Sequence, residues 1–115
     1  MEPRSRLRAA FLVFNGVDIL DFAGPLEIFS HVHHGMDFTS PDPAFELVTV
    51  GSANLVTSSA TVKLCPDIAL ADARSHIADF DILVIPGGPP HVIRNLVESN
   101  AEQLQLLTDF SDLPP

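Results

Sequence analysis

The chain is poor in cysteine, in basic residues and in long apolar runs. Its single cysteine, Cys65, cannot form a disulfide within the chain, which favours a reducing compartment, so we expect a cytoplasmic protein. Fifteen acidic residues against six Lys and Arg give a net charge of -9, which argues against nucleic-acid and anionic-membrane partners. No stretch approaches the roughly 20 apolar residues of a membrane span. At the start, "MEPRSRLRAAFLVF" has too short an apolar run for a signal peptide, so we interpret residues 1–7 as a leader.

Several site motifs are also missing: a phosphate-binding glycine loop, zinc-ligand spacing and a "GxSxG" nucleophile pattern. His31 and His34 could share a helix face and bind a metal, but no Cys or carboxylate lies at a supporting spacing. Histidines near a helix C-terminus also complement the helix dipole, so we expect no metal site there. Cys65 precedes Pro66 and has only Lys63 as a nearby cation, which favours a small packed residue over a reactive thiolate.

The first half of the chain predicts a buried strand followed by a helix. "RAAFLVFNG" is an apolar run closed by a turn dipeptide. The apolar residues after it recur at spacings of three and four, which predicts a helix from about Gly24 to His34. We place Pro25 in its first turn, Gly35 at its C-terminal cap and a loop through Asp21.

Further elements follow at short intervals. "FELVTVG" alternates and predicts a strand, "NLVTSSATVKL" a hairpin or two short extended arms, and "DIALADARSH" a brief helix. "DILVIPGG" is a second fully apolar strand that ends on two glycines. A last helix is expected over "SNAEQLQLLTDF", where Ser99 and Glu102 form a capping-box pattern.

Apolar strands alternating with helices indicate an α/β layer fold. Continuous apolar runs are buried on both faces, as in a parallel sheet covered by helices. Ligands of such sheets bind at the carboxyl ends of the strands. We therefore expect "NGVDILD" and "PGGPPH" to lie side by side and form the site.

Five residues in these two loops are candidates, and each has a structural alternative. Gly87 and Gly88 could present N–H groups as an oxyanion hole, or only form a tight turn. Asp18 and Asp21 could donate a proton or hydrogen-bond a thiolate, or only favour the positive end of a helix dipole. His91 could line the pocket mouth or lie on the surface.

Two segments, "FLVFNGVDILDFAGPLEIFS" and "DFDILVIPGG", resemble the ThiJ/PfpI (DJ-one/PfpI) superfamily over residues 8–110. "LDFAGPLEIF" is most similar to the isocyanide hydratase-like branch and to the amino-terminal domains of AraC-type regulators. The resemblance implies a partial flavodoxin-like (class I glutamine amidotransferase-like) three-layer sandwich with a mostly parallel sheet. It also implies that Asp21 hydrogen-bonds a nucleophilic cysteine, which the Gly87–Gly88 turn faces.

The chain departs from the family pattern where the nucleophile should follow. The family cysteine lies on a strand-to-helix elbow well after Pro-Gly-Gly, whereas Cys65 precedes that motif and the sequence stops at Pro115. We interpret residues 8–115 as an incomplete domain, truncated before the elbow. The resemblance implies that the parent domain is a cysteine-dependent hydratase or hydrolase of small molecules, with no metal or organic cofactor. We expect this chain to be inactive. The alternative is a ligand-sensing or non-catalytic interaction module, and a bare strand edge predicts a homodimer or pairing with a family member.

Overall fold

A four-stranded parallel sheet forms the centre of the computed structural model, which describes residues 5–36, 39, 41–99 and 101–114. The strand order is β7-β4-β1-β8, and neighbouring strands are parallel throughout. The four strands are β1 (Leu7–Leu12), β4 (Phe45–Gly51), β7 (Ile68–Ala69) and β8 (Ile82–Val84). The predicted α/β fold with a parallel sheet is therefore confirmed.

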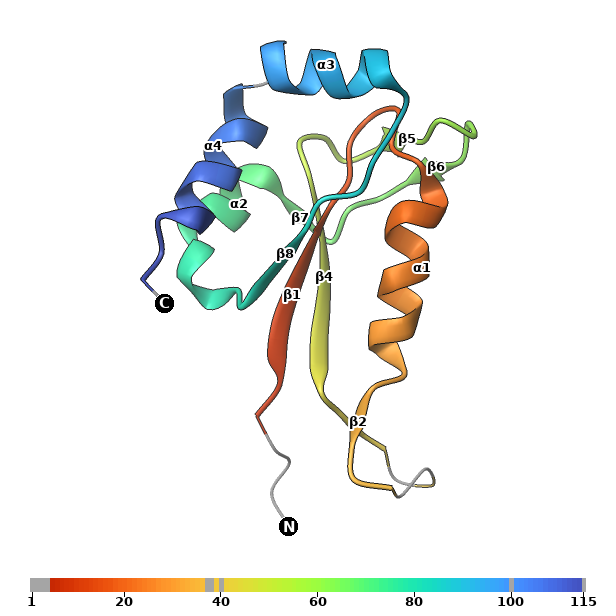
Figure 1. The fold of residues 1–115 in the computed structure, drawn as a ribbon, viewed down its shortest axis with the longest axis vertical. Coiled ribbons are helices and arrows are strands. Elements are labelled where there is room, and N and C mark those ends of the chain that lie inside the picture. Colours follow the sequence, from red (N-terminus) through yellow and green to blue (C-terminus); the bar gives the residue numbers. More distant parts are fainter. Residues whose placement is uncertain (1–4, 37–38, 40, 100, 115) are drawn as a thin grey trace.

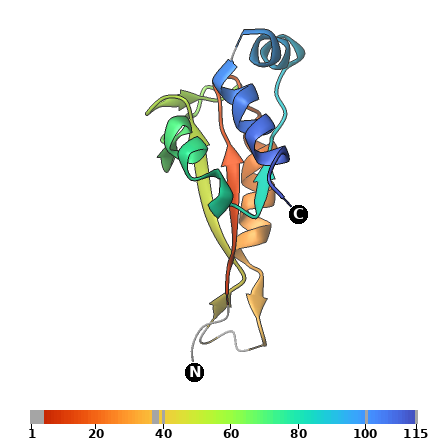
Figure 2. The same ribbon diagram turned by 90° about the vertical axis from the view of Figure 1, so that its left-hand side faces the viewer.

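Helices cover both faces of this sheet, which gives three layers (Figures 1 and 2). Helix α1 (Ile19–Ser30) lies on one face, and α2 (Leu70–Ser75) and α4 (Ala101–Ser111) lie on the other, with the short 3-10 helix η1 (Ile77–Asp79) after α2. Helix α3 (Pro90–Ser99) crosses above the carboxyl ends of the strands, at the top of Figure 1. No helix in the described ranges has both the length and the apolar character needed to cross a membrane.

The core is centred on β1, as its apolar sequence predicts. Residues 9–14 are all buried, because β1 pairs with β4 on one side and β8 on the other while helices cover its faces. Phe29 of α1 meets Phe11 edge-on, with ring centroids 5.8 Å apart, and stacks on Phe45 at 4.8 Å. These aromatic contacts hold α1 against β1 and β4.

The second apolar strand is shorter and more exposed than predicted. Only Ile82–Val84 joins the sheet; these three residues are half-buried and Ile85 is 46% exposed. The reason is position, since β8 has β1 on one side and no other strand of the described residues on the other. The expected burial on both faces is therefore wrong for this strand.

The first helix begins and ends earlier than predicted. It starts after Asp18, so Asp21 lies in its first turn and Pro25 in its interior. His33–His34 form β2, which pairs antiparallel with β3 (Asp42–Pro43). His31 and His34 therefore do not share a helix face, and Gly35, at φ +76°, follows β2 rather than capping the helix.

The remaining elements match the predictions in part. Strands β5 (Val56–Thr57) and β6 (Lys63–Leu64) form the expected hairpin. The brief helix is α2, preceded by the unpredicted strand β7. Ser99 ends α3 instead of starting a helix, and the capping-box contact with Glu102 lies outside the described side chains.

Candidate functional site

The two loops predicted to form the site do meet at the carboxyl ends of β1 and β8. The Asp18 N–H donates to the Gly87 carbonyl oxygen at 3.0 Å. Asp21 Oδ2 lies only 2.8 Å from the point that a Cβ on Gly87 would occupy. The carboxylate therefore rests against the bare Cα of Gly87, and a side chain at that position would displace it.

Gly88 and Gly16 complete this close approach. A Cβ on Gly88 would stand 3.0 Å from the Gly16 carbonyl oxygen and 3.5 Å from the Phe14 ring. Gly16 has φ +88°, a conformation that other residues adopt at a cost, and a Cβ there would lie 2.6 Å from Val92. The glycines thus let the backbones of the two loops lie against each other.

The β5–β6 hairpin holds the first loop from the other side. The Gly16 N–H donates to the Thr57 carbonyl at 2.8 Å, and the Thr57 N–H donates to Asn15 Oδ1 at 3.0 Å. Ser59 Oγ donates to Asp18 Oδ1 at 2.7 Å. The Asp18 side chain therefore contributes to this anchoring, and it does not line the cleft that contains His91.

Asp21 and the glycine turn form an arrangement suited to proton transfer and charge stabilisation. Asp21 is exposed in the first turn of α1, so its carboxylate is accessible to a bound molecule. The hydrogen bond from the Asp18 N–H is accepted by the carbonyl oxygen of Gly87, so this bond does not engage the N–H groups of the turn. A carboxylate can move a proton, and backbone N–H groups can stabilise negative charge that develops in front of them.

Cys65 does not join this arrangement, and the prediction that it is packed is wrong. The residue is exposed, after β6. It borders a cavity of about 80 Å³ whose lining includes neither Asp21 nor Gly87. The neighbouring Pro66 takes the packed position instead, because its ring lies against the Cα of Gly51.

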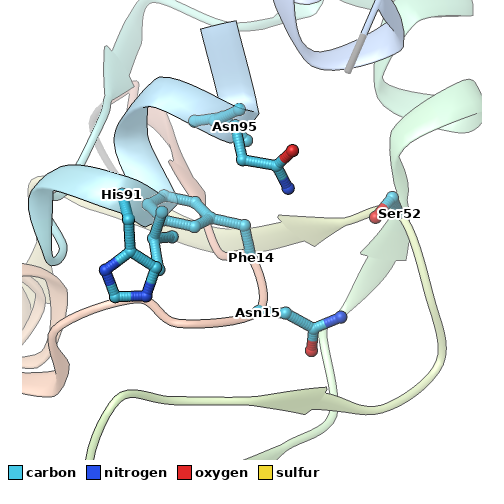
Figure 3. Close-up of a pocket in the computed structure, with 7 residues that line it drawn as sticks. Phe14, Asn15, Ser52, His91 and Asn95 are labelled. Carbon is cyan, nitrogen blue, oxygen red and sulfur yellow. The ribbon is translucent and has the colours of Figure 1, made fainter. Parts of the chain in front are cut away.

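His91 lies on the rim of a separate cleft of about 390 Å³ (Figure 3). Asn15, Ser52 and Asn95 share that rim. Ser52 directly follows β4 and Asn15 lies three residues after the end of β1, so the rule that ligands bind at the carboxyl ends of parallel strands could have found them. Asn95 lies one turn after His91 on α3, a helix that was not predicted. The role of His91 itself stays a prediction.

No three His, Cys, Asp or Glu side chains come together as a metal site would need, within the ranges that the structure describes. His31 caps the C-terminus of α1. His34 Nε2 lies 3.1 Å from the Ser5 carbonyl oxygen. The two histidines that were weighed as a metal pair therefore have separate surroundings.

Comparison with known proteins gives the family. A sequence model of the DJ-1/PfpI family matches residues 7–110. The chain belongs to the DJ-1/PfpI family. This match confirms the ThiJ/PfpI resemblance of the two segments that carry Asp21 and the Gly87–Gly88 turn. No curated protein sequence is significantly similar to the chain.

Solved structures show the same fold at low identity. A ThiJ/PfpI family protein from Pseudomonas syringae has a TM-score of 0.69 and 23% identity, over 91% of this chain and 38% of that one. Drosophila melanogaster DJ-1beta has a TM-score of 0.68 and 20% identity, over 93% and 51%. Toxoplasma gondii DJ-1 in its oxidized form has a TM-score of 0.66 and 15% identity, over 89% and 48%. The chain thus spans about half or less of these structures.

Proposed function

We propose that Asp21 is the proton donor of a cysteine-dependent hydratase or hydrolase site. In this proposal the backbone N–H groups of the Gly87–Gly88 turn stabilise negative charge at the same site. Isocyanide hydration is the reaction we favour, with a small molecule as substrate. The contact of the Asp21 carboxylate with Gly87 carries this proposal, because it joins the two motifs that the family resemblance singled out. Membership of the DJ-1/PfpI family supports it.

The proposed reaction needs a thiolate that this arrangement does not contain. A cysteine thiolate would add to the isocyanide carbon, and Asp21 would deliver a proton to that carbon. Water would then add and displace the thiol to give a formamide, while N–H groups of the turn stabilise negative charge. Cys65, the one cysteine of the sequence, borders a different cavity, so residues 1–115 by themselves should be inactive.

An assay of formamide production from cyclohexyl isocyanide tests both parts of the proposal. The 115-residue chain should give no formamide above buffer. A fusion that adds an elbow segment with a cysteine after Pro115 should give turnover. In that fusion, Asp21→Asn should lower the rate by about 100-fold or more, since general acid catalysis contributes on that order.

Asp79→Asn is the matched control, because Asp79 is an exposed aspartate in η1, away from both loops. It should leave the rate of the fusion within about twofold of the parent, as expected for a surface change. Formamide production by the unfused chain would contradict its inactivity. Equal rates for the Asp21→Asn and Asp79→Asn fusions would contradict the role of Asp21.

A second candidate function is a non-catalytic module that pairs with another chain. The observation that favours it is the edge of β8, which no other strand of the described residues covers. An uncovered strand edge offers backbone N–H and C=O groups to a further strand. The partner would be a second copy of this chain or a member of the same family, and the test is the association state considered in the Discussion.

A further inference from the structure

The cleft beside His91 has the volume of a small-ligand site. Its volume of about 390 Å³ falls within the range of roughly 300–1,000 Å³ that such sites occupy. It lies between the carboxyl ends of β1 and β4 on one side and α3 on the other. Neither Asp21 nor the glycines of the turn line it, so it is distinct from the site proposed above.

The floor of the cleft is apolar and its rim is polar. Phe14, Val92 and Leu96 supply the apolar surface, and Phe14 is only 2% exposed. Four neutral or weakly basic side chains form the rim, and Figure 3 shows them around the Phe14 ring. A ligand that fits must therefore carry both an apolar group and a polar head.

The hydrogen bonds of Asn15 fix which of its amide atoms is available to a ligand. Asn15 Oδ1 accepts the N–H of Thr57 at 3.0 Å, and the backbone of the next residue, Gly16, bonds the Thr57 carbonyl at 2.8 Å. The oxygen is thus engaged by the hairpin. The Nδ2 group of Asn15 remains as a donor, held in place at the rim by the same contact.

The opposite side of the rim is also rich in donors. His91 and Asn95 are four residues apart on α3, so their side chains lie on one face of that helix. In Figure 3 the amide group of Asn95 extends from α3 toward the cleft, and its nitrogen can donate, as can the hydroxyl of Ser52. The ring of His91 supplies a further N–H. Donors therefore converge on the cleft from three separate segments.

Among the residues whose side chains the structure describes, no Asp or Glu lines the cleft, although the chain carries fifteen of them. A cationic head would find no charged partner there, whereas an anionic head would find several N–H and O–H donors without an adjacent carboxylate. We propose that the cleft binds a small monocarboxylic acid, with the carboxylate at the rim of Asn15, Ser52, His91 and Asn95 and the apolar group over Phe14.

Three probes that share one apolar group test this proposal by titration calorimetry on the 115-residue chain. Phenylacetate should bind more tightly than phenylacetamide, and phenethylamine should show no measurable binding. Asn95→Leu removes one donor without adding charge. It should weaken phenylacetate binding about tenfold, as expected for a lost hydrogen bond to a charged group.

Asn15→Asp gives the sharpest contrast. An Asp at this position keeps an oxygen that can accept the Thr57 N–H, but it replaces the Nδ2 donor with negative charge. It should abolish phenylacetate binding and create binding of phenethylamine. Asn54→Asp, the same change at an exposed residue outside the cleft, should leave the affinity for phenylacetate within about twofold of the parent. Circular dichroism of each variant confirms that the fold is retained.

Two results would overturn the proposal. One is equal binding of phenylacetate and phenethylamine by the parent chain, or binding of none of the probes. The other is loss of phenylacetate binding in Asp21→Asn with no loss in Asn95→Leu, which would place the ligand at Asp21 instead. Formamide production plays no part in these measurements, so failure here is distinguishable from failure of the hydratase proposal.

Discussion

Gly16 shows at the residue scale how tightly the site loops are built. Its backbone has φ +88°, and its Cα faces the branched side chain of Val92 on α3. Its N–H bonds to Thr57 of the hairpin, and its carbonyl lies close to Gly88. Gly16 thus contacts the hairpin, the glycine turn and α3. It must lack a side chain both because its φ is positive and because Val92 occupies the space that a Cβ would need.

Gly16→Ala should therefore destabilise the protein strongly. The positive φ and the contact 2.6 Å from Val92 act together, and we expect the free energy of unfolding to fall by about 2–4 kcal/mol. Urea denaturation followed by circular dichroism measures the change. Gly24→Ala is the control, because apart from its two chain neighbours and the backbone of its own helix nothing lies within 4 Å of its Cβ position.

The control change should stay within about 1 kcal/mol of the parent, since the better helix propensity of Ala offsets its contact with the following Pro25. A Gly16→Ala variant as stable as Gly24→Ala would show that the loop relaxes freely. In that case Gly16 would not hold the site together.

At the scale of elements, the first strand and the meeting of the two site loops were predicted correctly. The apolar run before Asn15 predicts β1, and the strand-end rule correctly placed the Asp21 loop beside Gly87 and Gly88. The bounds of α1 were wrong because Pro25 was assigned to a first turn, although the helix contains it as an interior residue.

Other features depend on contacts that no local pattern encodes. Ser59 reaches Asp18 only because the hairpin docks on the first loop, across 41 residues of sequence. Helix α3 was missed because residues 92–98, which follow the "PGGPPH" loop, were assigned to no element. The spacing of Val92, Ile93 and Leu96 was the available helical signal, and Asn95 would have been placed beside His91 with it.

Helix α4 should be held in place by apolar burial rather than by its ion pair. Leu106 is only 1% exposed, whereas Arg74 Nε and Asp109 Oδ2 are 3.4 Å apart in a partly exposed pair. Leu106→Ala should lower the free energy of unfolding by about 2–5 kcal/mol. Asp109→Asn should lower it by less than about 1 kcal/mol, because surface pairs contribute little.

Thermal unfolding of both variants, with Val97→Ala as an exposed apolar control on α3, measures these differences. Hydrogen exchange within residues 105–111 should rise in Leu106→Ala and stay unchanged in Asp109→Asn. A larger loss for Asp109→Asn than for Leu106→Ala would mean that electrostatics anchors the helix.

At the scale of the whole molecule, the edge of β8 is the feature most open to another chain. Ile85, directly after the strand, is 46% exposed. The edge of β8 that faces away from β1 has no neighbour among the described strands. A strand edge of this kind promotes pairing between chains. We expect the chain to self-associate in a concentration-dependent way.

Ile85→Lys should shift the chain toward monomer in size-exclusion chromatography with light scattering, because a charge at a strand edge opposes pairing. Ile28→Lys, which places the same charge on the outer surface of α1, is the comparison, since Ile28 is 68% exposed. A stable monomer with a sharp thermal transition in the parent chain would contradict the expectation. Dissociation by Ile28→Lys alone would assign the contact to α1.

The parallel order of the sheet also determines when β1 can acquire its partners during synthesis. Ala9 pairs with Leu47 on one side and with Ile82 on the other, so both neighbours are made long after β1 itself. Contacts so distant in sequence form slowly, because a long loop must close before they can stabilise anything. An emerging chain therefore carries β1 without its β4 partner until residues 45–51 have been made, and one edge of β1 stays open until residues 82–84 follow.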